Sequence, residues 1–174
     1  SRLSLAGISR HKTKTLQGNV SLGVFYEPTD KDKIGLQIDY NPDKNRSTVT
    51  SHTQMLSELS EETTLGTYRS DYKFHNLNVA LNYSHMLDNK GSVLKWNSNY
   101  NYQYSSTDEN NRMQWLPLGT DSIYTTDNTN RYNIIDTEVS LQKNFKPGWR
   151  LNAGLKYTHN DVGYDSRHFN FLNN

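Results

Sequence analysis

The sequence predicts an all-β protein, built as an antiparallel up-and-down meander of strands. Apolar and polar residues alternate with a period of two along several segments, which is typical of strands that expose one face to water. Short turns containing Gly, Asp, Lys or Pro join these segments in pairs, and such turns connect antiparallel neighbours. We therefore expect hairpins that follow one another in chain order.

The first predicted hairpin joins residues 20–26 to residues 34–40 through the turn EPTDKDK. Its even-numbered positions are apolar or aromatic, while its odd-numbered positions are mostly small or polar. Pro28, together with the Asp and Lys residues of the turn, favours a tight reversal of the chain. Both strands of this hairpin are thus expected to present one apolar face.

Two further hairpins follow the same pattern. Residues 77–83 and 94–104 are joined by LDNKG, and residues 135–145 and 149–157 are joined by KPG. In each strand one set of alternate positions is rich in Leu, Ile, Val, Trp and Tyr, and the other set is rich in Asn, Ser, Lys and Asp. The chain therefore contains three predicted hairpins with one apolar and one polar face each.

Two polar segments, 41–71 and 105–131, separate the hairpins, and they are much longer than the loops of compact domains. We expect them to be long loops. Weaker strand patterns near 3–12 and 46–56 bring the expected number of strands to about eight, in a single segment that covers residues 1–174.

The connections are sorted by length. In a meander, successive connections lie at opposite ends of the sheet, so the short turns are expected at one end and the long segments at the other. A soluble sandwich has no reason for such sorting. An outer-membrane barrel does, because its periplasmic ends are tight turns and its extracellular ends are long loops.

Aromatic residues lie where the apolar stripes end. The stripes cover about seven to nine residues each, close to the ~9–11 residues with which a tilted strand crosses a bilayer. Rings at both ends suit the two aromatic girdles of a membrane barrel, and the polar face suits a water-filled or plugged lumen. The pattern predicts part of a transmembrane β-barrel whose apolar face contacts outer-membrane lipid. The candidate girdle residues are Tyr26, Tyr83, Phe145 and Trp149 beside the short turns, and Tyr40, Tyr104 and Tyr157 toward the long segments.

Composition excludes several other classes. Hydrophobic residues make up only 33% of the chain and the mean hydropathy is −0.91, which is a poor match to a helical bundle. Nineteen Lys and Arg residues nearly balance 18 Asp and Glu residues, so we expect no nucleic-acid partner. The chain has no Cys, which excludes disulfides and thiolate metal sites. No apolar run is long enough for a transmembrane helix.

The chain also resembles a known family. The segments YEPTDKDKIGLQIDY, LNYSHMLDNKGSVLKWNSNYNYQYSSTDEN and NFKPGWRLNAGLKYTHNDVGYD are similar to outer-membrane β-barrels of the TonB-dependent receptor type from Gram-negative bacteria. The resemblance covers roughly residues 18–165. It implies a parent barrel of about 22 strands, a plug domain, a TonB-contacting segment and a signal peptide, none of which we expect within this chain. It also implies nutrient uptake across the outer membrane.

Few residues are candidates for a binding site. Trp115 and Tyr124 lie in the more apolar part of a long segment and could hold a small nutrient or a glycan. His159 and Asp161 share a strand face, but their spacing matches no compact metal motif. The sequence contains no nucleophile elbow, HExxH motif or phosphate-binding glycine loop, so we expect no enzyme, no metal and no cofactor.

Two alternatives remain open on the sequence alone. One is a soluble all-β carbohydrate-binding module that uses Trp115 and Tyr124. The other is a non-transporting barrel that only anchors or adheres. For the isolated segment we expect the apolar faces to be covered either by curling of the sheet into a smaller closed sheet or by self-association through its exposed sheet edges. We also expect either a β-bulge near His75 and Asn76 or the exit of the strand from the bilayer, because the apolar positions change from even to odd there.

Overall fold

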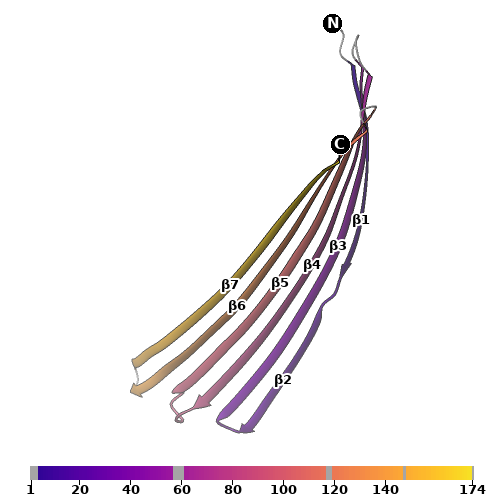
Figure 1. Ribbon diagram of the computed structural model, residues 1–174. Helices are drawn as coiled ribbons and strands as arrows, with labels where there is room; N and C mark the ends of the chain where they lie inside the picture. Colours follow the sequence, from indigo (N-terminus) through magenta and orange to yellow (C-terminus); the bar gives the residue numbers. More distant parts are fainter. Residues whose placement is uncertain (1–3, 57–60, 117–118, 147, 174) are drawn as a thin grey trace.

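The residues that the structure describes form one sheet of very long strands, with no second layer among them (Figure 1). The computed structural model describes residues 4–56, 61–116, 119–146 and 148–173. The strands are β1 (Ser4–Gln17), β2 (Val20–Thr29), β3 (Asp32–Leu56), β4 (Glu61–Met86), β5 (Val93–Leu116), β6 (Thr120–Lys146) and β7 (Trp149–Asn173).

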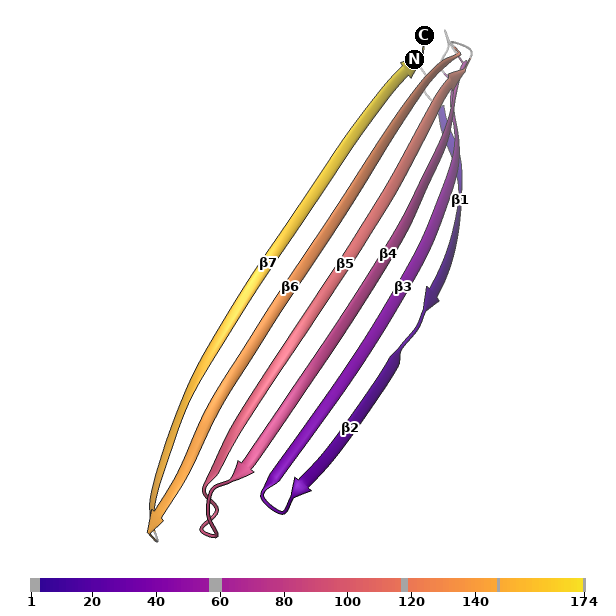
Figure 2. The ribbon, with the colours of Figure 1, turned by 60° about the horizontal axis from the view of Figure 1, so that its bottom comes forward.

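The strands follow one another as an antiparallel meander. β3, β4, β5, β6 and β7 each pair with the next strand in the chain, and β1 and β2 both pair with β3 (Figure 2). The sheet does not close, so β7 forms one edge and β1 with β2 forms the other. The predicted fold class is thus confirmed, and an open sheet is consistent with a segment of a barrel wall.

β1 and β2 form a single edge that is interrupted opposite Pro42. The Gly18 N–H donates to the Pro42 carbonyl at 3.0 Å, so this carbonyl and the proline nitrogen face the edge strand. Proline has no N–H to offer, and the ladder is broken at this point. A Cβ on Gly18 would lie 3.2 Å from Pro42 Cγ, so glycine permits the close approach.

The long polar segments are not loops, which corrects the expectation for 41–71 and 105–131. β3 continues to Leu56 and β4 begins at Glu61, while β5 continues to Leu116 and β6 begins at Thr120. Both faces are largely polar in these halves of the strands, so apart from the weak pattern near 46–56 no alternation predicts strands there. The backbone is nevertheless paired along the full length.

The number of strands also differs from the expected eight. The structure has seven, because residues 46–56 are the end of β3 rather than a strand of their own. The segment near 3–12 falls almost entirely within β1, whose partner is that same half of β3.

There is no β-bulge at His75 and Asn76, contrary to one of the two expectations for this position. The ladder runs without a shift through Pro42 and His75 on one side of β4 and through Asn76 and Gln103 on the other. Tyr72 therefore lies on the opposite face of the sheet from Leu77. The change of parity marks a place where the apolar side chains change face.

The turns at the lower end of the sheet are staggered. The closing pairs are Thr29 with Asp32, Leu87 with Ser92, and Lys146 with Trp149. When the paired residues are followed from strand to strand, each closing pair lies two or three residues further along the strand direction than the closing pair of the preceding hairpin. With about 3.4 Å per residue and ~4.8 Å between strands, the line of turns is inclined by roughly 35–45° from the perpendicular to the strands. Strands of closed barrels have this tilt.

None of the hydrophobic side chains that the structure describes is buried. A soluble domain buries an apolar face between two packed layers, and here one layer stands alone. The sheet is held by its backbone ladder, and its apolar face is left for another partner.

The turns provide a first test of this structure. Gly91 has φ of +79°, and a Cβ there would lie 3.3 Å from Asn144 Nδ2. We expect Gly91→Ala to lower the free energy of unfolding by about 1 kcal/mol, because the left-handed backbone disfavours alanine. Urea unfolding of the protein in detergent measures the change.

The matched control is Gly23→Ala within β2. A Cβ at Gly23 meets no atom nearer than 3.9 Å, so this variant should be neutral or slightly stabilising. Equal losses in the two variants would contradict the backbone conformation of the turn.

Candidate functional site

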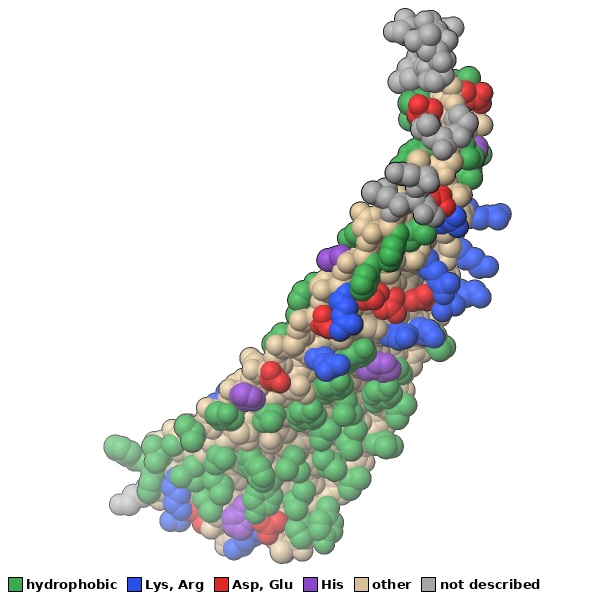
Figure 3. Space-filling view, viewed as in Figure 1, with side chains coloured by type: hydrophobic (Ala, Val, Ile, Leu, Met, Phe, Trp, Pro, Cys, Tyr) green, Lys and Arg blue, Asp and Glu red, His purple; other side chains and the backbone are tan. Residues whose placement is uncertain are grey.

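The ladder gathers the apolar residues of all three hairpins on one face. Directly opposed residues share a face, and one such row runs from Leu22 through Ile38, Val79 and Tyr100 to Ile135. Figure 3 shows hydrophobic side chains covering the half of the sheet near the turns. We call this surface the apolar band. It comprises Val20, Leu22, Val24, Tyr26, Ile34, Leu36, Ile38, Tyr40, Leu77, Val79, Leu81, Tyr83, Leu94, Trp96, Tyr100, Tyr102, Ile135, Val139, Leu141, Leu151, Ala153, Leu155 and Tyr157.

Nothing in the described part of the chain covers the apolar band. Leu22 is 65% exposed and Leu155 is 77% exposed. Soluble monomers rarely expose a contiguous apolar patch of more than a few hundred Å². The band is therefore a surface for contact with another apolar phase or partner.

Aromatic side chains lie at both ends of the band. Tyr26 and Tyr83 share a row with Trp96 near the lower turns, and Phe145 and Trp149 flank the third turn. Tyr40 and Tyr104 lie at the upper end, and each is in ring contact with His75 at 6.1 Å between centroids. Tyr157 lies eight residues beyond Trp149, where β7 leaves its turn, and Tyr40 lies eight residues beyond Asp32, where β3 leaves its turn. Both rings are therefore at a similar distance from the inclined line of turns.

The opposite face of the same strands is polar. Asp39 accepts hydrogen bonds from Ser21 and Gln37, and Asn101 donates to Asn76 at 2.9 Å. Lys156 forms an ion pair with Asp136 at 2.9 Å on this face. Such a surface is suited to water or to a polar partner and cannot pack as the second layer of a sandwich.

The second turn is fixed to β6 through Asp88. Its carboxylate accepts from Lys143 Nζ at 2.8 Å and from the backbone N–H groups of Lys90 at 2.9 Å and Ser92 at 3.2 Å. Lys143 first, then the side chain of Ser92 and the two backbone N–H groups, hold the pKa of Asp88 well below its usual range. The turn is thus ordered by a charge that is present at neutral pH.

Beyond the apolar band the same face becomes charged. Asp71 accepts from Arg46 and Arg69, and these two cations hold its pKa below the usual value against the opposing effect of burial. Arg112 pairs with Asp121 at 2.5 Å. Figure 3 shows most of the Lys, Arg, Asp and Glu side chains of this face beyond the lower, mainly hydrophobic half, with some hydrophobic side chains among them.

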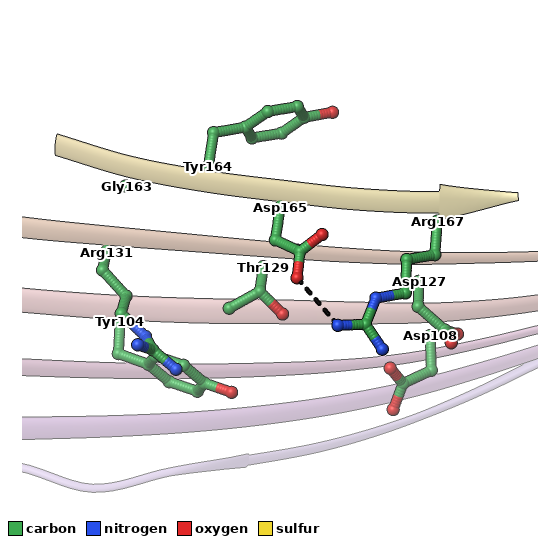
Figure 4. Close-up of a pocket in the computed structure, with 9 residues that line it drawn as sticks. All are labelled: Tyr104, Asp108, Asp127, Thr129, Arg131, Gly163, Tyr164, Asp165 and Arg167. Atoms are coloured by element: carbon green, nitrogen blue, oxygen red, sulfur yellow. Dashed lines mark hydrogen bonds and ion pairs between the residues drawn. The ribbon is translucent and has the colours of Figure 1, made fainter.

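A shallow hollow of about 490 Å³ lies in this charged half, across β5, β6 and β7. Arg131 and Arg167 lie in it together with the carboxylates of Asp108, Asp127 and Asp165 (Figure 4). Arg167 contacts Asp165 at 3.1 Å, and the Arg131 guanidinium lies 5.9 Å from the ring centre of Tyr104. Cations and carboxylates nearly balance here.

The structure does not bring the two ligand-binding candidates together. Trp115 and Tyr124 share a face, but Trp115 lies opposite Thr120 and Tyr124 opposite Asn111, four residues apart along the ladder. This separation is roughly 13 Å. Tyr124 instead stacks on His168, with 6.1 Å between ring centres. Their role in binding stays a prediction.

His159 and Asp161 lie on the outer strand β7, opposite Ile135 and Asn133. No group of three potential metal ligands occurs among the residues that the structure describes. No helix in the described ranges is long and apolar enough to cross a membrane.

Sequence reasoning missed the charged half of the apolar face and the inclined line of turns. Both depend on which residues are opposed across strands that are 20 or more residues apart in the chain. Only the stagger of the turns had a signal in the sequence. The number of residues between successive turns gives this stagger once the pairing register of the strands is known.

Comparison with known proteins gives a weak result. No protein-family model matches the chain, and no curated protein matches it. Similar solved structures include the Lamprey immune protein, with 9% identity, a TM-score of 0.22, and coverage of 99% of this chain and 48% of that one. The ferric citrate transporter FecA has 12% identity, a TM-score of 0.20, and coverage of 92% and 33%.

The beta domain of the Bordetella autotransporter Brka has 10% identity, a TM-score of 0.18, and coverage of 93% and 90%. FecA and this domain are outer-membrane β-barrels. The chain spans less than half the length of the first structures that it matches. Likeness at these TM-scores carries no argument about function.

Asp88 provides a test of the turn by pH. Because its pKa is lowered in the folded state, its contribution to stability is present above its unfolded pKa of about 3.9 and is lost as the pH falls below that value. We expect Asp88→Asn to lower the urea unfolding midpoint at pH 7. At acid pH, the midpoints of this variant and of the parent protein should lie closer together.

Asp161→Asn is the control, since Asp161 has no ion pair within the described ranges. Urea midpoints between pH 2.5 and pH 7 measure both variants. A pH profile unchanged by Asp88→Asn would show that the contact with Lys143 does not hold the turn.

Proposed function

We propose that the chain is part of the wall of an outer-membrane β-barrel, with the apolar band against lipid and the polar face toward the lumen. The observation that carries the proposal is the apolar band itself: one continuous apolar face on a single-layer sheet that buries none of the hydrophobic side chains described. A lipid bilayer is the solvent that suits this face.

The dimensions of the band support the proposal. On β5, Leu94 at the lower end of the band and Tyr104, the aromatic residue that borders its upper end, are about 34 Å apart along the strand. At a tilt of ~40° this spans about 26 Å along the membrane normal, close to the ~25 Å apolar height of outer-membrane barrels. The height thus combines two separate observations, the tilt from the stagger of the turns and the length along the strand from the positions of the side chains.

A soluble carbohydrate-binding module has less support. Such a module needs a packed core, and the described residues form none. Its proposed aromatic pair, Trp115 and Tyr124, is also separated along the hairpin. We therefore prefer the membrane wall.

Within the barrel class, we propose a TonB-dependent receptor that takes up a scarce nutrient. The support is the family resemblance of the hairpin segments, together with long hairpins at the end of the sheet opposite the tight turns. The wall residues would do no chemistry: they hold lipid on one face and a plug on the other, and energy would come from TonB. A barrel that only anchors or adheres is the competing possibility.

Cysteine labelling tests the membrane wall, because the chain has no cysteine of its own. Leu81 faces the band and Ala80 faces the polar side of the same strand. In intact cells or proteoliposomes, we expect a membrane-impermeant maleimide to label Ala80→Cys through the lumen and to leave Leu81→Cys unlabelled. Detergent with denaturant should expose both positions. Labelling of both in the bilayer would sink the proposal.

A charge at the same two positions gives an energetic test. We expect Leu81→Arg to destabilise the protein in a bilayer by about 2–4 kcal/mol, because the arginine must enter the hydrocarbon region. Ala80→Arg, on the polar face, should cost much less. Urea unfolding in lipid vesicles measures the difference, and similar costs for both variants would contradict the assignment of the two faces.

The proposal of a TonB-dependent receptor requires a test in cells. A strain that lacks the protein and a strain that lacks TonB should show the same loss of uptake of the nutrient. Uptake or surface adhesion that persists without TonB would favour the anchoring or adhesive barrel instead.

A further inference from the structure

We propose that the wall binds the phosphate-bearing headgroup of an anionic membrane lipid at a set of four lysines just beyond the apolar band. We call Lys12, Lys14, Lys44 and Lys73 the basic cluster. This inference rests on the proposed membrane wall, since it needs the apolar band to lie in lipid.

The basic cluster lies on the same face as the apolar band. Lys44 is four residues beyond Tyr40 on β3, with Pro42 between them, and the even parity places all three on one face. Lys73 is directly opposite Lys44 on β4, and Lys14 is directly opposite Arg46 on β3. The cluster is thus a continuation of the lipid-facing surface, at the level where headgroups replace acyl chains.

The charges of the cluster lack partners in the protein. No carboxylate lies within ion-pair distance of the four lysines among the residues that the structure describes, and all four are exposed. The neighbouring Arg46 and Arg69 differ, because both form ion pairs with the carboxylate of Asp71. Lys44 and Lys73 are directly opposed across the strand pair, an arrangement that is unfavourable unless an anion lies between them.

A hollow joins the cluster to the band. It has a volume of about 420 Å³ and lies at the break between β1 and β2. Leu16 and Pro42 contribute its apolar lining, and Lys44 and Lys73 also line it. Asp43 reaches the hollow too, but it belongs to the opposite face, where Gln17 donates to its carboxylate at 3.3 Å. An apolar hollow beside two ammonium groups fits the junction of an acyl chain and a phosphate.

The part of the charged half on β5, β6 and β7 has no comparable group of unpaired lysines among the residues described. Around the hollow of Figure 4, Arg131 and Arg167 are accompanied by three carboxylates, so that surface has no excess of positive charge. Figure 3 shows Lys and Arg side chains concentrated near the edge formed by β1. A lipid phosphate is therefore expected at β1, β3 and β4 and not across β5, β6 and β7.

The test uses the intact protein folded in neutral detergent. It is titrated separately with short-chain phosphatidylglycerol, short-chain phosphatidylcholine and inorganic phosphate, and binding is followed by the thermal unfolding midpoint. We expect phosphatidylglycerol to bind at least about tenfold more tightly than phosphatidylcholine, with a preference that weakens in high salt. Inorganic phosphate should have little effect, because it cannot use the apolar hollow.

Variants assign the effect to the cluster. Replacing all four lysines by glutamine should remove the preference for phosphatidylglycerol, while Lys44→Arg with Lys73→Arg should retain it. Lys95→Gln, an exposed lysine on the polar face, is the matched control and should behave like the parent protein.

The outcomes separate the two proposals. An unchanged preference in the glutamine variant, or equal stabilisation by inorganic phosphate, would overturn the lipid site. If Leu81→Cys is shielded in the bilayer but no lipid preference exists, only the lipid site fails. If Leu81→Cys is labelled in the bilayer, both proposals fail.

Discussion

The uninterrupted hydrogen-bond ladder from β3 to β6 is the constraint on which every functional surface of this protein depends. Side chains alternate between faces with a period of two, so a slip of one residue at any strand pair would move all apolar side chains of one strand to the polar face. No shift interrupts the pairs β3–β4, β4–β5 and β5–β6. The two irregularities beside the turns and the break at Pro42 lie outside these pairs. One register therefore defines the apolar band, the polar face and the basic cluster together.

The three hairpins near the turns could be predicted from the sequence because one of their faces is apolar. Alternation of Leu77 with Asn78 carries information about both strand and face. Beyond Pro42 and Tyr104 both faces are largely polar, so the only periodic signal is the weak pattern near 46–56, although the backbone pairs as completely as before. Polar composition suggested loops where Ser, Thr, Asn and Tyr in fact extend the ladder. The missing information was the pairing partner, which no local pattern contains.

The same reason explains what could be predicted of the site. The positions of the aromatic residues predicted as girdles follow from the ends of each stripe and could be found strand by strand. The basic cluster could not, because Lys12 and Lys14 are about 30 residues from Lys44 and about 60 from Lys73 in the chain. Only the pairing of β1 with the upper half of β3 places them together. Trp115 and Tyr124 were selected by residue type alone, and residue type does not fix their separation along the hairpin.

The boundary between the two halves of the face is itself built from specific contacts. The Tyr40 hydroxyl lies 2.7 Å from His75 Nδ1, His75 is tilted against Tyr104, and Arg131 lies over the ring of Tyr104. The Tyr and His rings combine carbon surface with polar atoms, and amphipathic rings of this kind are favoured at a water–lipid interface. These residues lie on four neighbouring strands that share one hydrogen-bond ladder. The register of that ladder therefore fixes the position of the boundary on all four strands together. In the proposed membrane wall, the basic cluster directly beyond this boundary would lie at the depth where lipid phosphates occur.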